Sequence, residues 1–315
     1  MSDTAITARG LTKRYNGDIL AVDGLDLDVP CGTIYALLGP NGAGKTTTVS
    51  MLTTLLRPTA GTATVAGYDV VSASAQVRAR IGVTFQETVL DKDLRGQEVL
   101  DYHGRLYGMP RAERARRIAE LLALVELDEA APRLVKGYSG GMKRRLELAR
   151  GLMTDPEVLF LDEPTQGLDP QNRAKVWEYL GTLRTRRGLT ILLTTHDMEE
   201  ADTLADRVAI VDHGKLVVEG TPRELVTGMG ADVIRIQGAG ESEALVEALG
   251  EMPFVQTIHR GDGLIQVGVD QGNRRLPEIV TCANQSGFRI EFIAVAHPTL
   301  ADVFLRHTGR ALRDV

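Results

Sequence analysis

One segment of the chain has the residue types and spacing of a phosphate-binding loop. Residues 39–46 read Gly-Pro-Asn-Gly-Ala-Gly-Lys-Thr, which fits the pattern G-x-x-x-x-G-K-[ST]. The glycines let the backbone wrap around a polyphosphate with its N–H groups turned inward, and the helix expected next adds the positive end of its dipole. The apolar run directly before the loop argues against a plain glycine-rich turn. We therefore predict a nucleoside triphosphate site, with Lys45 on the β- and γ-phosphates and Thr46 on Mg²⁺, built from Gly39, Pro40, Asn41, Gly42, Ala43, Gly44, Lys45, Thr46 and Thr47.

Two carboxylates follow a second apolar run. Asp162 and Glu163 come directly after residues 158–161. At the end of a strand beside the phosphate loop, Asp162 would bind Mg²⁺ through its water shell. Glu163 could then accept a proton from the water that attacks the γ-phosphate, a role that typically contributes about 10²–10⁴-fold to a rate. Such a pair also occurs at ordinary helix or turn starts, but Lys45 upstream in the same predicted sheet favours the catalytic interpretation.

A third motif has the features of a helix start. Residues 138–145 read Tyr-Ser-Gly-Gly-Met-Lys-Arg-Arg. Ser139 is a favourable N-cap residue, and Gly140 and Gly141 leave backbone N–H groups accessible. Ordinary capping is one interpretation. The other is a second anion site, in which the Ser139 hydroxyl and the Gly141 amide donate to a γ-phosphate.

Short apolar runs predict the strands that position these motifs. Continuous runs of this kind are typical of parallel strands that are covered on both faces. Their alternation with helices predicts an α/β sheet with its ligand at the carboxyl ends of the strands. The predicted strands include residues 33–38, 62–65, 81–84, 158–161, 191–194 and 208–211.

The pattern becomes helical between Leu94 and Leu127. An apolar stripe is formed by Ile118, Leu121, Leu122 and Val125. We expect the opposite, basic side to be a solvated helix face, with contact to a partner as the alternative; it comprises Arg111, Arg114, Arg116 and Arg117. We expect Trp177 to serve core packing.

The residue pattern of the chain changes near residue 230. Residues 227–230 (Thr-Gly-Met-Gly) predict a linker, so we place one domain at 1–228 and another at 229–315. The second reads as strand, helix, two strands, helix and strand, an order that predicts a small ferredoxin-like domain. The predicted elements are strand 232–237, helix 241–250, strands 254–259 and 263–269, helix 274–286, strand 288–294 and a last helix from Thr299.

Composition limits the classes of protein that remain. The chain has 315 residues, 43% of them hydrophobic, and a net charge of −6, which gives no general attraction to nucleic acid or to an anionic membrane. Cys31 and Cys282 match no metal or redox spacing, which favours a reduced cytosolic setting. The sequence shows no signal peptide and no apolar stretch of 18 residues. We therefore expect neither a nucleic acid partner nor a span across a bilayer, and any membrane role would require a partner.

In combination, these motifs resemble the nucleotide-binding subunit of ATP-binding cassette (ABC) transporters. The family's signature Leu-Ser-Gly-Gly-Gln appears here as residues 138–142. The resemblance covers residues 4 to about 225 and implies a P-loop NTPase cassette, with a RecA-like core, a helical subdomain at about 90–155 and the small C-terminal α+β domain. It also assigns further ATP-site roles: Tyr15 stacks on adenine, Gln86 senses the γ-phosphate and Mg²⁺, Asp169 lies in the loop that crosses the dimer interface, and His196 is the switch histidine.

The resemblance implies that two subunits close head to tail around ATP. Because this chain carries one copy of each motif, we expect a homodimer or a pairing with a sibling chain. The variant signature, together with residues 298–309, resembles the daunorubicin/doxorubicin-resistance type, whose ATPases power a separate ABC-2-type permease. That implies an exporter of a drug, antibiotic or lipid at the cytoplasmic face of the cell membrane, with residues 87–90 meeting the permease.

Alternatives remain for the function and for the C-terminal domain. An importer ATPase with a ligand-sensing tail would require a neighbouring substrate-binding protein, and the signature Tyr-Ser-Gly-Gly-Met at residues 138–142 argues against it. A soluble ABC ATPase of translation or DNA repair would require two cassettes, a long coiled-coil insertion or a zinc-binding insertion. The C-terminal domain could serve docking or dimer stabilisation, ligand sensing, or structural support.

Overall fold

The computed structural model describes residues 3–15, 19–86, 89–227, 232–261, 264–296 and 298–308. The chain divides into two compact units, Met1–Thr221 and Pro222–Ala311. Helix α8 (Pro222–Thr227) thus belongs to the second unit, whereas the predicted boundary lay between residues 228 and 229. Of the predicted linker 227–230, residues 228–230 lie outside the described residues.

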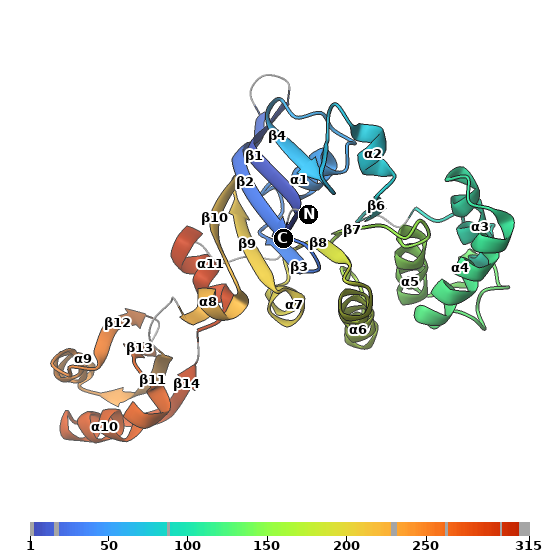
Figure 1. The fold of residues 1–315 in the computed structure, drawn as a ribbon. Coiled ribbons are helices and arrows are strands. Elements are labelled where there is room, and N and C mark those ends of the chain that lie inside the picture. The colour runs from blue at the N-terminus through green and yellow to red at the C-terminus, as the bar shows by residue number, and fades with distance from the viewer. Residues whose placement is uncertain are drawn as a thin grey trace. The chain divides into compact units, whose positions relative to one another are not determined.

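A six-stranded sheet forms the centre of the first unit (Figure 1). The strands from β9 to β6 are parallel to their neighbours, and β10 pairs antiparallel at one edge. Every residue of β3, β7 and β8 is buried, which explains their continuous apolar sequences. In spatial order the strands are β10 (Lys215–Gly220), β9 (Arg207–Asp212), β3 (Ile34–Leu38), β8 (Thr190–Thr195), β7 (Val158–Asp162) and β6 (Ile81–Thr84).

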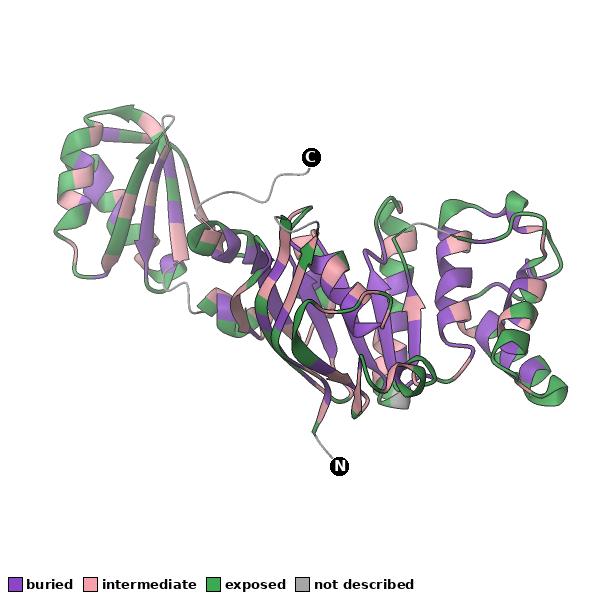
Figure 2. Cartoon of the chain, turned by 90° about the horizontal axis from the view of Figure 1, so that it is seen from above, coloured by how far each residue is buried: buried purple, intermediate pink, exposed green. Residues whose placement is uncertain are grey.

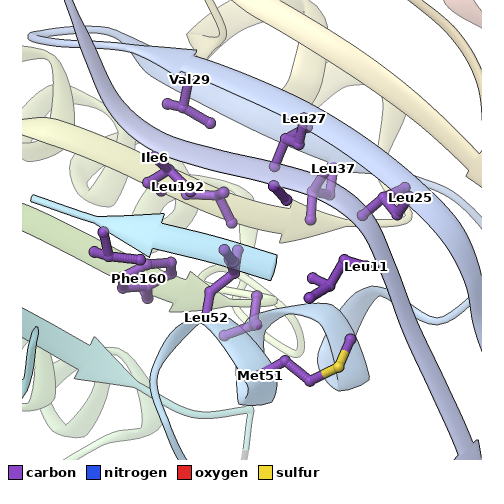
Figure 3. Close-up of a cluster of buried hydrophobic side chains, with 14 of the residues drawn as sticks. Ile6, Leu11, Leu25, Leu27, Val29, Leu37, Met51, Leu52, Phe160 and Leu192 are labelled. Atoms are coloured by element: carbon purple, nitrogen blue, oxygen red, sulfur yellow. The ribbon is translucent and has the colours of Figure 1, made fainter. Parts of the chain in front are cut away.

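A second, antiparallel sheet lies over the central one. Its order is β2 (Ile19–Pro30), β1 (Thr4–Tyr15), β4 (Ala60–Val65) and β5 (Tyr68–Asp69). Helix α1 (Lys45–Leu52) contributes Met51 and Leu52 to the apolar core, where side chains of both sheets meet (Figure 3). Buried residues run along the strands of both sheets (Figure 2). Because α1 is packed into this core, the loop that precedes it is firmly positioned.

Several of the remaining helices of the first unit form a helical subdomain. It comprises α3 (Gly96–Leu106), α4 (Arg111–Leu124), the 3₁₀ turn η1 (Val135–Gly137) and α5 (Gly140–Gly151). Outside it lie α2 (Ser74–Arg78), α6 (Pro170–Arg187) and α7 (Met198–Leu204). The subdomain corresponds to the predicted helical stretch and follows β6 in the chain.

The predicted solvated basic face of α4 is wrong for two of its four arginines. Arg114 and Arg117 are buried, while Arg111 and Arg116 are exposed. Arg114 pairs with Asp101 of α3 and donates to the Met109 carbonyl oxygen, 2.8 Å away. The side chain of Arg117 donates to the Leu152 carbonyl oxygen at 2.8 Å. These long side chains find their partners on neighbouring segments, so they pack inward next to the apolar stripe.

The second unit contains the predicted order of elements. Its sheet has the order β12-β13-β11-β14, and each neighbouring pair is antiparallel. Apolar side chains of these strands form one core with side chains of the two helices that connect them along the chain. The elements are β11 (Asp232–Gly240), α9 (Ser242–Gly250), β12 (Val255–Gly261), β13 (Leu264–Val269), α10 (Gly272–Gln285), β14 (Phe288–Ala296) and α11 (Leu300–Thr308), and α11 packs against α8.

The burial of Arg117 gives a test of the helical subdomain. Arg117→Met keeps the side-chain volume but removes the donors to Leu152 and Asp155, so we expect the free energy of unfolding to fall by about 1–2 kcal/mol. Arg116→Met is the matched control, because that side chain is 68% exposed and its loss should change stability by no more than about 0.5 kcal/mol. Urea unfolding followed by Trp177, the single tryptophan, reports on this unit. Equal effects of the two substitutions would contradict the assignment.

Candidate nucleotide-binding site

Three groups of predicted site residues lie at the carboxyl ends of neighbouring strands: the phosphate loop, the pair Asp162 and Glu163, and His196. Strand β3 ends at Leu38, directly before the phosphate loop, and Leu38 pairs with Thr195 at the end of β8. On the other side of β8, Asp162 at the end of β7 pairs with Thr194. Parallel strands therefore bring three chain segments, far apart in sequence, to one edge of the sheet.

The phosphate loop has a backbone that side chains would obstruct. A Cβ atom on Gly39 would lie 2.2 Å from the Val211 carbonyl oxygen. Gly44 precedes α1 with φ of +99°, and a Cβ there would lie 2.4 Å from the Ala21 carbonyl oxygen. Both positions therefore need glycine, for close approach at Gly39 and also for a left-handed backbone at Gly44.

Lys45 is buried at the base of this loop, with 5% of its surface exposed. Its Nζ atom donates to the carbonyl oxygens of Gly39 at 2.7 Å and Pro40 at 3.2 Å. The same atom lies 3.2 Å from Oε1 of Glu163, whose side chain is also buried. The predicted phosphate ligand and the predicted base thus form an ion pair.

Glu163 occupies a left-handed turn that other residues hold. Its φ is +49°, which is unusual for a residue with a side chain. The Glu163 amide donates to the carbonyl oxygen and Oγ1 of Thr194, at 3.2 and 3.1 Å. On the far side of the carboxylate, Oε2 lies 2.8 Å from Nδ1 of His196. The turn thereby places the carboxylate between Lys45 and His196.

Asp162 and Thr46 supply oxygen atoms suited to Mg²⁺. Thr46 Oγ1 lies 3.2 Å from Asp162 Oδ1, to which Thr194 Oγ1 also donates at 2.5 Å. Hydroxyl and carboxylate oxygens are hard ligands, and Mg²⁺ is commonly held by one or two such groups together with phosphates and waters. The residues present therefore fit the predicted ion.

Gln86, also predicted as a Mg²⁺ ligand, contacts a different segment. Its Nε2 atom donates to Gln166 Oε1 at 2.8 Å, in the loop that follows Glu163. Tyr15, the predicted adenine-stacking residue, is the last residue of β1 and lies beside Lys13, whose Nζ is 5.3 Å from the ring centroid.

The helix starts at Ser139 and Asp169 are joined through one side chain. Ser139 caps α5, with Oγ accepting from the Met142 amide at 3.2 Å. Asp169 caps α6, accepting from the Asn172 amide at 3.0 Å, which lowers the pKa of the Asp169 carboxyl. A Cβ on Gly141 would lie 2.5 Å from the Asn172 side chain, whereas the space next to Gly140 is open. The two predicted dimer-interface motifs therefore pack on each other.

Sequence reasoning missed several residues that fasten the site. Thr194 is one, and Glu200 is another: its buried carboxylate accepts from Thr165 Oγ1 at 2.7 Å and from Trp177 Nε1 at 3.2 Å. Burial raises the pKa of Glu200. The indole of Trp177 therefore does more than the predicted core packing, since it links α6 to the segment after His196. No local motif marks these contacts.

The geometry defines an ATPase cassette of the P-loop class, and comparisons with known proteins identify its family. The family model for the ABC transporter matches residues 22–166. The Daunorubicin/doxorubicin resistance ATP-binding protein DrrA of Streptomyces peucetius is 45% identical, covering 98% of this chain and 94% of the relative. Nod factor export ATP-binding protein I of Burkholderia orbicola (strain AU 1054) is 42% identical, covering 100% of both. The chain belongs to the ABC transporter family, as an ATP-binding, ATP-hydrolysing subunit of the daunorubicin/doxorubicin-resistance type.

Solved structures agree on the fold. The cbiO1 protein of Clostridium perfringens, part of the ABC transporter complex cbiONQ, matches with a TM-score of 0.67 at 24% identity, covering 80% of this chain and 97% of that one. A dimeric post-hydrolysis state of the ATP-binding cassette MJ0796, bound to ADP and Pi, matches with a TM-score of 0.62 at 26% identity, covering 69% and 98%. Within the described residues, none of the helices has the length and apolarity needed to cross a membrane.

The contact between Thr46 and Asp162 gives a test of the metal site. Thr46→Val keeps the shape of the side chain but removes the oxygen, so we expect the Mg²⁺ concentration for half-maximal ATP hydrolysis to rise about tenfold or more. Thr46→Ser restores the oxygen and serves as the control. Titration of activity with free Mg²⁺ at saturating ATP measures the effect. The same Mg²⁺ dependence in both variants would contradict the role of Thr46.

Proposed function

We propose that Lys45, Thr46, Asp162, Glu163 and His196 carry out Mg²⁺-dependent ATP hydrolysis. The observation that carries this assignment is the placement of the Glu163 carboxylate between Lys45 and His196, beside the Mg²⁺ oxygens of Thr46 and Asp162. Mg²⁺ supplies charge neutralisation on the phosphates. A carboxylate held at this point of the sheet can accept the proton of an attacking water.

ATP binding requires Lys45 to exchange partners. To reach the β- and γ-phosphates, its Nζ atom must leave the carbonyl oxygens of Gly39 and Pro40 and the carboxylate of Glu163. That exchange releases the Glu163 carboxylate from its ion pair with Lys45. His196 still contacts the carboxylate in the arrangement observed, so it can hold its orientation while the nucleotide enters.

We also infer that two copies of the chain form the active unit. Ser139 and Gly141 lie at the start of α5, where free backbone N–H groups and the helix dipole favour an anion. The proposal places the γ-phosphate of one protomer against this helix start of its partner. The similarity to a dimeric ATP-binding cassette supports it.

Glu163→Gln separates binding from hydrolysis. We expect kcat to fall by about 100-fold or more because the amide cannot accept the proton, while ATP binding and ATP-dependent dimerisation persist. Phosphate release and light scattering measure the two properties. Ser139→Arg is the companion variant and should abolish turnover with little effect on the ATP affinity of a single protomer. Near-normal hydrolysis by Glu163→Gln, or loss of ATP binding by Ser139→Arg, would contradict the respective role.

We propose further that the chain powers export through a separate integral membrane permease of the ABC-2 type, at the cytoplasmic face of the cell membrane. Its relatives are named for daunorubicin and doxorubicin resistance and for Nod factor export. These names favour export over import, with a drug, an antibiotic or a lipid-like molecule as the cargo. Those relatives are matched along nearly the whole chain, so the second unit is shared with them. We assign that unit to docking or dimer stabilisation.

Exposed apolar side chains mark the proposed permease contact. Phe85 precedes Gln86, and Val89 follows the undescribed residues 87–88. Tyr102 and Leu106, four residues apart on α3, are 53% and 84% exposed. Val89 is tied to α5 through Arg150, whose Nη1 donates to the Val89 carbonyl oxygen at 2.8 Å. Exposed apolar side chains that cluster on a surface are typical of protein interaction sites, which supports a permease contact here.

Leu106→Glu tests this contact. We expect the variant to hydrolyse ATP at the wild-type basal rate but to lose co-purification with its permease, because a charge cannot be buried there without a counterion. Leu55→Glu is the matched control, since Leu55 is also exposed, at 60%, but follows α1. Retention of Leu106→Glu on permease-containing membranes, equal to that of the control, would rule out this surface.

A further inference from the structure

Arg144 is a buried arginine in the helix that Ser139 caps. It lies five residues after Ser139 in α5, and 8% of its surface is exposed. Burial lowers the pKa of its guanidinium, and the neighbouring Glu147 carboxylate opposes that shift. A charge in such a position needs several hydrogen-bond acceptors.

The acceptors of Arg144 belong to the turn that carries Glu163. Its Nη2 atom donates to the carbonyl oxygens of Asp162 and Glu163, both at 2.9 Å. Its Nε atom donates to the carbonyl oxygen of Pro164 at 2.7 Å. Three consecutive backbone carbonyls are thus held by one side chain. Because Thr194 holds the Glu163 amide from the opposite side, the left-handed turn is fastened on both sides.

The third nitrogen of Arg144 reaches the segment of Gln86. Its Nη1 atom donates to the Phe85 carbonyl oxygen at 2.6 Å and to Glu147 Oε2 at 3.2 Å. The other carboxylate oxygen of Glu147 accepts from the Val89 amide at 3.0 Å. Helix α5 therefore holds the chain on both sides of Gln86.

We propose that Arg144 is a positioning residue for ATP hydrolysis, which aligns the Glu163 turn and the Gln86 segment with the helix that begins at Ser139. The inference rests on the proposed role of Glu163 as the base. A planar guanidinium with five N–H donors can bond to acceptors on several sides at once, whereas the ammonium of lysine is a compact point with three donors. Lysine at this position would leave part of the turn unheld.

Steady-state hydrolysis by the full-length chain tests the proposal through Arg144→Lys. We expect kcat to fall by about 10- to 100-fold, because small displacements of a catalytic group cost up to about 100-fold, while KM for ATP stays within about threefold. Arg145→Lys is the matched control. Arg145 is buried in the same helix but donates to the Val125 and Glu126 carbonyl oxygens, and its variant should keep kcat within about twofold. Arg144→Gln, which introduces no buried ammonium, gives a second variant with the same expected split between kcat and KM.

A double substitution distinguishes positioning from general stability. If Arg144 acts through Glu163, adding Arg144→Lys to Glu163→Gln should lower the residual rate by less than about threefold, because residues that act as a unit are not additive. Fluorescence of Trp177 during urea unfolding shows whether each variant is folded. Equal loss of kcat in Arg145→Lys, or multiplied losses in the double variant, would overturn the proposal. Near-normal hydrolysis by Glu163→Gln alone would instead refute the assignment of Glu163 as the base, and with it the inference about Arg144.

Discussion

The site depends on keeping two opposite charges buried at the end of a parallel sheet. Lys45 and Glu163 are 5% and 6% exposed, with Nζ and Oε1 3.2 Å apart. Removing both charges from water is costly, and their attraction offsets that cost only when other groups satisfy the remaining donors and acceptors. Here the carbonyl oxygens of the phosphate loop bind the ammonium and His196 contacts the carboxylate. The loop, the β7 turn and the end of β8 are therefore held in mutual register by electrostatics as well as by strand pairing.

The same constraint links nucleotide binding to the rest of the proposed cycle. Electrostatic interactions are strong where water is excluded. The exchange of the Lys45 partners for phosphate oxygens therefore involves a large change in interaction energy. The terminal phosphate also carries enough negative charge to attract a second helix start, which the proposed dimer supplies at Ser139. Hydrolysis and release of phosphate would remove that attraction and allow the protomers to separate. A local exchange of ion-pair partners thereby becomes a movement between subunits.

Local sequence predicted the parts of this structure that depend on neighbouring residues. The buried strands followed from continuous apolar runs, and the phosphate loop followed from its glycines, of which Gly39 and Gly44 leave no space for a Cβ. The order of elements in the second unit followed from the alternation of strand-like and helix-like residue patterns. In contrast, the burial of Arg114 and Arg117 depends on partners such as Asp101 and Leu152, which only the tertiary fold brings near. The boundary at Thr221 was also missed, because α8 packs on α11 at the far end of the chain.

The acceptors of the buried arginines explain why such contacts have no sequence signature. Backbone carbonyls are present at every residue, so a side chain that binds them leaves no matching residue type elsewhere. Among the described residues, four arginines are buried, and three of them bind within the subdomain or its flanks: Arg114 to Met109, Arg117 to Leu152 and Arg145 to Val125. Arg144 alone among these four bonds to the turn after β7. These bonds to consecutive backbone carbonyls of one turn agree with the role in alignment that is proposed for Arg144. Arg144 therefore joins the subdomain directly to the turn that carries Glu163. Other contacts, such as the ion pair between Lys175 of α6 and Glu126, join the subdomain to the core elsewhere.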